Sequence, residues 1–139
     1  LRYELVYQLK ADFPHLCIGI NGGIVTSEQV QNHLARVDSV MVGREAYHNP
    51  FWLADWDAAF LGAHCADITR DSVELAMVDY MEREAGLHGT PWQAIARHML
   101  GLRHGQHGAR KWRQVWSDHR LKAHSPRAVM ALAHEAAFA

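Results

Sequence analysis

Two stretches decide the fold: Cys17-Ile18-Gly19-Ile20-Asn21-Gly22-Gly23-Ile24 and, further along the chain, Val40-Met41-Val42-Gly43-Arg44. Each is a short apolar strand that opens into glycine, and the 21 residues from Gly22 to Gly43 leave room for a turn, a helix and a return strand. Apolar strands joined in this way predict a parallel βαβ unit. Glycines after a buried strand let backbone N–H groups approach an anion, and such loops hold phosphate after strands 7 and 8 of many (β/α)₈ barrels.

The length places this unit within a larger fold. The chain has 139 residues and begins at Leu1 inside an expected helix, whereas a complete barrel needs roughly 250 residues. We therefore expect an α/β fragment, the last two βα units of a TIM barrel over residues 1–61, followed by an all-α helical bundle over residues 71–139.

Periodicity and capping signals predict the individual elements. In the α/β part we expect a helix over 3–13, strands at 16–20 and 39–42, and a helix from a Thr26–Gln29 capping box to about 35, with Val30 and Leu34 facing inward. One helical turn over 44–47 and a helix over 51–61 precede a linker at 62–70.

Four further helices make up the expected bundle, at about 71–85, 91–103, 109–120 and 126–138. Asp71 and Glu74 resemble a helix start, Gly86 a stop, and Thr90 an N-cap before a proline.

Charge is distributed unevenly along a chain whose formal net charge is −1. Residues 55–84 carry eight acids against two arginines, whereas residues 97–127 carry eight of the 14 Lys and Arg residues and one acid. The basic segment predicts an anionic partner, with a solvated helix face as the alternative.

Other site classes find little support in the sequence. The two cysteines form no disulfide framework and indicate a reducing compartment, the cytoplasm. We expect Cys17 to be a small core residue and Cys65 to lie in a linker, neither of them a nucleophile. The histidines lack metal-ligand spacing, so we assign no metal, and no apolar stretch approaches a membrane span.

The segment Arg110-Lys111-Trp112-Arg113-Gln114-Val115-Trp116 has the pattern of an amphipathic helix. Trp112, Val115 and Trp116 share one face, which favours bundle core over stacking on bases. Arg110, Arg113 and Arg120 should lie together on the other side, with Lys111 on a flank, where they could meet phosphates.

Four strings together resemble the tRNA-dihydrouridine synthases, most closely the bacterial DusA subgroup. They are residues 20–24, residues 40–50, Arg97-His98-Met99-Leu100-Gly101-Leu102 and Gly108-Ala109-Arg110-Lys111-Trp112-Arg113. The resemblance runs from about Tyr3 to Leu132. It implies an FMN-binding barrel, a helical domain that binds tRNA, and reduction of D-loop uridines 20 and 20a to 5,6-dihydrouridine with NADPH as the reductant.

The resemblance also implies roles for individual residues. Asn21, Gly22, Gly23, Gly43 and Arg44 would hold the FMN phosphate. Without the resemblance, the first loop reads as an ordinary turn, and Arg44 could instead pair with Glu28 or Glu45. The candidate tRNA contacts are Arg97, Arg110, Lys111 and Arg113.

This sequence departs from the family pattern by lacking the first six βα units and, with them, the catalytic cysteine. We therefore expect no catalytic residue here, an inactive fragment that can self-associate through unpaired strand edges, and a monomeric parent enzyme. Two alternatives stay open: another FMN-dependent TIM-barrel oxidoreductase, and a stand-alone RNA-binding helical module.

Overall fold

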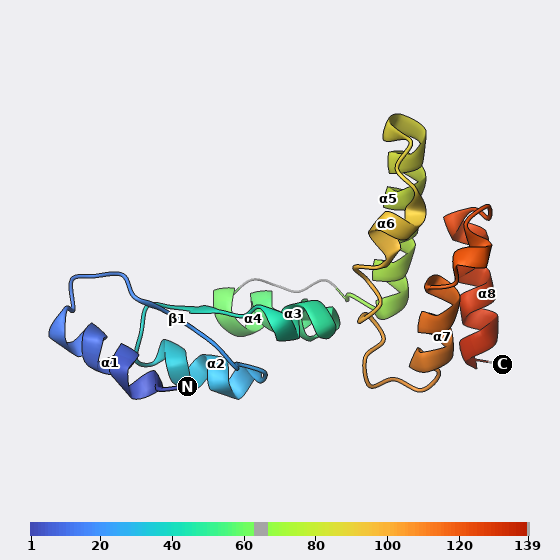
Figure 1. The fold of residues 1–139 in the computed structure, drawn as a ribbon. Coiled ribbons are helices and arrows are strands. Elements are labelled where there is room, and N and C mark those ends of the chain that lie inside the picture. Colours follow the sequence, from blue (N-terminus) through green and yellow to red (C-terminus); the bar gives the residue numbers. More distant parts are fainter. Residues whose placement is uncertain (63–66, 139) are drawn as a thin grey trace. The chain divides into compact units, whose positions relative to one another are not determined.

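The computed structural model describes residues 1–62 and 67–138. The chain divides into two compact units, Leu1–Ala46 and Tyr47–Ala139, which we call the sheet unit and the helical unit. Figure 1 shows the elements of each. The predicted linker at 62–70 falls partly outside the described residues, and His64 and Cys65 lie outside them altogether.

The sheet unit is a parallel βαβ unit preceded by one helix. Helix α1 (Tyr3–Asp12) leads to strand β1 (Gly19–Asn21), helix α2 (Ser27–Leu34) and strand β2 (Ser39–Met41). The strands pair in parallel, with Gly19 opposite Ser39 and Asn21 opposite Met41. This topology confirms the expected strand–helix–strand connection.

Local chemistry explains where α2 begins and which face it buries. The side chain of Thr26 accepts a hydrogen bond from the backbone of Gln29, and the Gln29 side chain accepts in return from the Thr26 backbone, so the predicted capping box is present. Val30 is buried as expected, but Leu34 is 39% exposed and His33 is buried in its place. The Tyr7 hydroxyl lies 2.6 Å from His33 Nδ1, which satisfies this buried ring.

The core of the sheet unit is small, and it consists of Ile18, Ile20, Ile24, Val30 and Val37. Cys17 was expected in this core, but it is exposed, because β1 begins only at Gly19 and Cys17 lies in the preceding loop.

The helical unit contains short and long helices in succession. Its elements are α3 (Arg44–His48, whose first turn belongs to the sheet unit), a 3₁₀ helix (Pro50–Asp55), α4 (Trp56–Leu61), α5 (Arg70–His88), α6 (Trp92–Ala96), α7 (Ala109–Trp116), a second 3₁₀ helix (His119–Leu121) and α8 (Pro126–Phe138). Helices α7 and α8 lie side by side in Figure 1.

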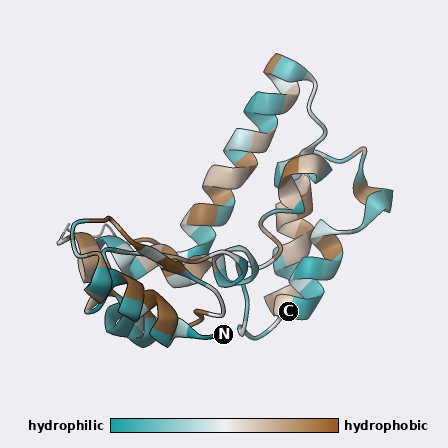
Figure 2. Ribbon diagram, turned by 60° about the vertical axis from the view of Figure 1, so that its left-hand side comes forward, coloured by the Kyte–Doolittle hydropathy of each residue, from teal (hydrophilic) through white to brown (hydrophobic). Residues whose placement is uncertain are grey.

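Helix α5 differs most from the expectation. It begins at a capping box between Thr69 and Ser72, not at Asp71 and Glu74, and it ends at Gly89, which adopts a left-handed conformation with φ of 65°. Gly86 was expected to stop the helix, but it lies within it. Hydrophobic and hydrophilic bands alternate along α5 in Figure 2.

Three other helices are shorter than the sequence predicts. The helix expected over 51–61 begins as a 3₁₀ helix with Pro50 in its first turn. The helix expected over 91–103 is regular only to Ala96, after which the chain runs through hydrogen-bonded turns. The helix expected over 109–120 ends at Trp116, and Asp118 then caps a separate 3₁₀ helix.

One contiguous hydrophobic core holds the helical unit together. Trp112, Trp116, Met81 and Val129 are buried in it, and Phe51 packs against its edge. This contact and the division between residues 46 and 47 group residues 47–61 with the helical unit. The division into a barrel part at 1–61 and a tRNA-binding part at 71–139 stays a prediction about function.

None of the helices within residues 1–62 and 67–138 combines the length and hydrophobicity that a membrane span requires.

Candidate functional site

The two glycine loops leave the sheet at the same edge. Because β1 and β2 run parallel and Asn21 pairs with Met41, the segments after Asn21 and after Met41 both follow the carboxyl ends of neighbouring strands. In open parallel sheets, this is the edge at which ligands bind. Val42 separates the end of β2 from Gly43 and Arg44, and both of these residues are exposed.

Glycine is required in the first loop. Gly22 and Gly23 have φ of 118° and 61°, backbone conformations that residues other than glycine rarely adopt. Tyr3 donates a hydrogen bond from its hydroxyl to the Gly22 carbonyl, which anchors the loop to α1. A Cβ on Gly23 would lie 2.9 Å from the Leu1 side chain, so the loop is also packed from one side. The roles of Asn21, Gly22, Gly23, Gly43 and Arg44 in phosphate binding stay predictions.

The amphipathic segment folds as predicted over most of its length. Trp112 and Trp116 are 0% and 2% exposed, which makes them core residues and excludes stacking on a base in this structure. Arg110, Lys111 and Arg113 on the same helix, α7, are exposed.

Arg120 does not extend this row of cations. It lies in the 3₁₀ helix after α7 and pairs with Asp118, whose carboxylate is 2.7 Å from its guanidinium. Hydrogen bonds from the Arg120 side chain and backbone lower the pKa of Asp118 to about 2. Arg120 was expected beside Arg110 and Arg113, but the helix ends too early.

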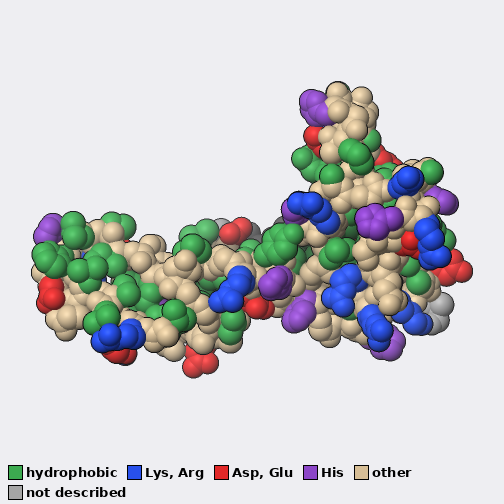
Figure 3. All heavy atoms as spheres, viewed as in Figure 1, with side chains coloured by type: hydrophobic (Ala, Val, Ile, Leu, Met, Phe, Trp, Pro, Cys, Tyr) green, Lys and Arg blue, Asp and Glu red, His purple; other side chains and the backbone are tan. Residues whose placement is uncertain are grey.

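The other cations of the basic segment differ in whether they form ion pairs. Among the described residues, Arg103 pairs with Asp71 and Glu74, and Arg127 pairs with Asp79 and Glu82. The predicted tRNA contacts form no ion pair within that part of the chain; they are Arg97, Arg110, Lys111 and Arg113. On the face shown in Figure 3, Lys, Arg and His side chains gather over the helical unit.

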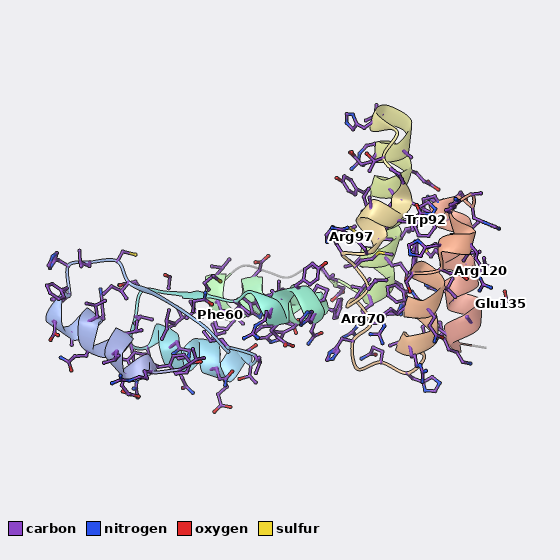
Figure 4. The ribbon with its side chains drawn as sticks, in the orientation of Figure 1. Phe60, Arg70, Trp92, Arg97, Arg120 and Glu135 are labelled. Atoms are coloured by element: carbon purple, nitrogen blue, oxygen red, sulfur yellow. The ribbon has the colours of Figure 1, made fainter. Side chains whose placement is uncertain are left out.

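The structure brings two of these four residues together. Arg97, at the carboxyl end of α6, and Arg113, on α7, line one cavity of about 480 Å³. Figure 4 labels Arg97 beside α6. Tyr47 and His48 from α3 line the same cavity, as do His98 and His104. Arg110 and Lys111 do not line it.

Sequence reasoning missed a second polar cluster, which is centred on Glu74. This carboxylate is 0% exposed and lies in the core. Trp112 and Trp116 donate their indole N–H groups to Oε1 at 2.7 and 2.9 Å, and Arg103 donates to Oε2 at 2.7 Å. A sequence pattern that places an acid among apolar residues on one helix face was the only available signal.

Arg103 keeps its charge in this cluster. Its burial opposes the charged form, but hydrogen bonds to Glu74 and Asp71 outweigh the burial and hold the pKa of Arg103 above its usual value. Ligand atoms of Asp71, Glu74 and His134 lie within 4.8 Å of one another, a spacing that could suit a metal ion. The Arg103 guanidinium already donates to the carboxylates of Asp71 and Glu74, so it supplies the positive charge that a metal ion would otherwise bring.

Comparison with known proteins gives this geometry a context. The sequence model of the family described as "Dihydrouridine synthase (Dus)" matches residues 1–137. Three relatives bear the name tRNA-dihydrouridine(20/20a) synthase. That of Salmonella typhi is 48% identical over 130 residues, that of Shewanella oneidensis is 45% identical over 135, and that of Escherichia coli K12 is 50% identical over 123.

The alignments cover 94%, 97% and 88% of this chain, but only 39%, 40% and 35% of the respective relatives. The chain thus spans about two fifths of the length of these relatives. The match over nearly all of its residues is sufficient for a family assignment, and the chain belongs to the dihydrouridine synthase family.

Proposed function

We propose that this chain is the carboxyl-terminal part of a flavin-dependent tRNA-dihydrouridine synthase. The whole enzyme would reduce D-loop uridines, at positions 20 and 20a, to 5,6-dihydrouridine, and NADPH would reduce its flavin. The parallel, in-register pairing of β1 and β2 carries this proposal, because it is the arrangement that the last two strands of a (β/α)₈ barrel require. The names of the relatives indicate the substrate.

The loops at the sheet edge suit the phosphate of FMN. Two successive glycines with positive φ expose backbone N–H groups without a Cβ, and Arg44 adds an exposed guanidinium at the start of the next helix. Asn21, Gly22, Gly23, Gly43 and Arg44 would hold the phosphate. FMN, when bound, supplies the hydride for the reduction. We propose no catalytic residue within this chain.

We place the tRNA-binding surface on the helical unit. Arg97, Arg110, Lys111 and Arg113 form no ion pair among the described residues, so their charges remain available to phosphates. Each phosphate contact that is lost should lower the slope of log affinity against log salt by about 0.7–0.9.

A chimera tests the proposal. The aligned part of this chain would replace the matching region, about 123 residues, of the Escherichia coli relative, in cells that lack the native enzyme. We expect mass spectrometry to find dihydrouridine at positions 20 and 20a of tRNA. In the purified chimera, Arg44→Ala should reduce the FMN content, whereas Arg83→Ala, which removes an exposed arginine of α5 in the helical unit, should leave it unchanged.

Two results would contradict the proposal. A folded, flavin-loaded chimera that forms no dihydrouridine would exclude the proposed activity for this sequence. Equal FMN content in the Arg44→Ala and Arg83→Ala variants would exclude Arg44 as a phosphate ligand.

A further inference from the structure

We infer that the cavity of the helical unit binds one phosphate-bearing nucleotide of RNA, and that the Tyr47 hydroxyl donates a hydrogen bond to it. This inference rests on the proposed function and deepens it. The cavity measures about 480 Å³, within the range of small-molecule sites. Its polar lining consists of Tyr47, His48, Arg97, His98, His104 and Arg113, and no acid lines it among residues 1–62 and 67–138.

The charges in this cavity favour an anion. Arg97 and Arg113 approach it from α6 and α7, and neither forms an ion pair among the residues that the structure describes. Two guanidinium groups around one cavity can bind phosphate oxygens through several charge-assisted hydrogen bonds. Arg103, Arg120 and Arg127 of the same basic segment form ion pairs with acids instead, and Arg110 does not line the cavity.

A chain of hydrogen bonds determines how Tyr47 is oriented. Arg97 donates its Nε–H to His98 Nε2 at 3.1 Å. Because an arginine can only donate, Nε2 must be the acceptor, and the proton of a neutral His98 ring is then on Nδ1. His98 Nδ1 lies 2.9 Å from the Tyr47 hydroxyl, so it donates to the phenolic oxygen.

This tautomer leaves the Tyr47 O–H proton for a different acceptor. The side chain is 51% exposed, so a ligand can reach the hydroxyl. An O–H group whose oxygen already accepts a bond from a histidine is a stronger donor, because chained hydrogen bonds polarise one another. A phosphate oxygen held by Arg97 and Arg113 is the acceptor that the cavity offers.

Gly101 allows the walls of the cavity to meet. A Cβ at this position would lie 2.3 Å from the carbonyl oxygen of His48, so any larger residue would push α3 away from the turn after α6. Tyr47 precedes His48 in α3. The glycine therefore keeps the Tyr47 hydroxyl within reach of His98.

Binding of unmodified tRNA to the 139-residue chain tests the inference by fluorescence anisotropy across a salt series. We expect Tyr47→Phe to weaken binding about 10-fold, the effect of losing one hydrogen bond to a charged group, and to leave the salt slope unchanged. Arg97→Ala should weaken binding and also lower the slope by about 0.7–0.9.

Matched controls separate a specific site from general attraction. Tyr80→Phe alters an exposed tyrosine of α5 outside the cavity, and Arg127→Ala removes an arginine that two acids already neutralise. Both variants should bind as the parent does. Circular dichroism of each variant checks that the helices are retained.

The outcomes distinguish this inference from the proposed function. If tRNA binds and Tyr47→Phe equals the parent, or if Arg127→Ala loses as much affinity as Arg97→Ala, the nucleotide site is wrong. If a combined Arg110→Ala and Lys111→Ala variant then binds tRNA more weakly than the parent, the proposed binding of tRNA by the helical unit would still be supported. If the parent chain binds no tRNA, both are wrong.

Discussion

At the scale of single residues, the Glu74 carboxylate has a full set of partners. Oε1 accepts from two indoles and Oε2 accepts from Arg103, while His134 Nε2 lies 2.9 Å from Oε2. A buried charge is tolerated only when it is paired and hydrogen-bonded in this way. The cluster joins residues from α5, α7, α8 and the turns after α6.

We expect Glu74→Gln to destabilise the helical unit by about 3–5 kcal/mol. A glutamine has one acceptor oxygen, so its NH₂ group would face either the two indoles or Arg103, all of which are donors. Urea unfolding followed by tryptophan fluorescence measures the loss. All five tryptophans lie after residue 46, so this signal reports on the helical unit alone.

Glu84→Gln is the matched control for this substitution. Glu84 also lies on α5, and its carboxylate lies 3.9 Å from the ring of His88, whose side chain is 64% exposed. This change should stay within about 0.5 kcal/mol of the parent. Equal stability of the two variants would show that the Glu74 cluster contributes nothing specific.

Asp118 gives a prediction about pH. The Arg120 side chain holds the pKa of this carboxylate at about 2 instead of 3.8. A lowered pKa in the folded state means that the stabilisation is complete above pH 3.8 and is lost as the pH falls toward 2. In Arg120→Ala, the Asp118 carboxyl should titrate closer to 3.8 in carbon-detected NMR. An unchanged midpoint would exclude Arg120 as the cause.

The role of Glu74 could not be predicted from the sequence. Its spacing from Asp71 resembles a helix start, and local patterns do not reveal that the partners Arg103, Trp112 and Trp116 come from 29 to 42 residues away. The burial of Trp112 and Trp116 was predictable, because their spacing puts both on one face of a short helix.

At the scale of elements, α5 shows how caps decide the length of a helix. Thr69 and Ser72 start it by reciprocal hydrogen bonds, and Gly89 ends it by adopting a left-handed conformation. Gly86 and Gly89 both look like stop signals in the sequence. Only the backbone conformation distinguishes the glycine that ends the helix from the one within it.

Alanine at these two glycines should have opposite effects on stability. Gly86→Ala should stabilise the chain by about 0.5–1 kcal/mol, because the position is helical and, apart from the backbone of α5 itself, no described atom lies within 4 Å of the added Cβ. Gly89→Ala should destabilise it by about 1 kcal/mol, because φ is 65° there. Urea unfolding measures both, and the same sign for both changes would refute the assigned end of α5.

The strands and the first capping box were predictable because their signals are local. Thr26 and Gln29 are three residues apart, and the strands are short apolar runs that end in glycine. The helix after Pro91 was overestimated for a different reason. Apolar spacing continues through Leu102, but the close contact between Gly101 and the His48 backbone accompanies a run of turns. The spacing of apolar residues along the sequence does not reveal contacts between segments that are distant in the chain.

At the scale of the whole chain, the two units differ greatly in the size of the hydrophobic core that stabilises each. The sheet unit has two paired strands of three residues each and a core of five apolar residues. A parallel pair of this size is marginal without further strands, because its outer edges are unpaired. The helical unit has a larger core, which includes three buried tryptophans.

We therefore expect the two units to open separately in hydrogen exchange. Backbone amides of Val78 and Trp112 should be far better protected than those of Ile20 and Val40, because local opening costs least where few apolar contacts hold the backbone. Glu74→Gln should reduce protection at Val78 and Trp112 but not at Ile20 and Val40, since the partners of Glu74 in the described part of the chain lie within the helical unit. Glu84→Gln serves again as the control. An equal loss at Ile20 and Val40 would mean that the chain unfolds as one cooperative body, and that the Glu74 cluster also supports the sheet edge where we place the phosphate loops.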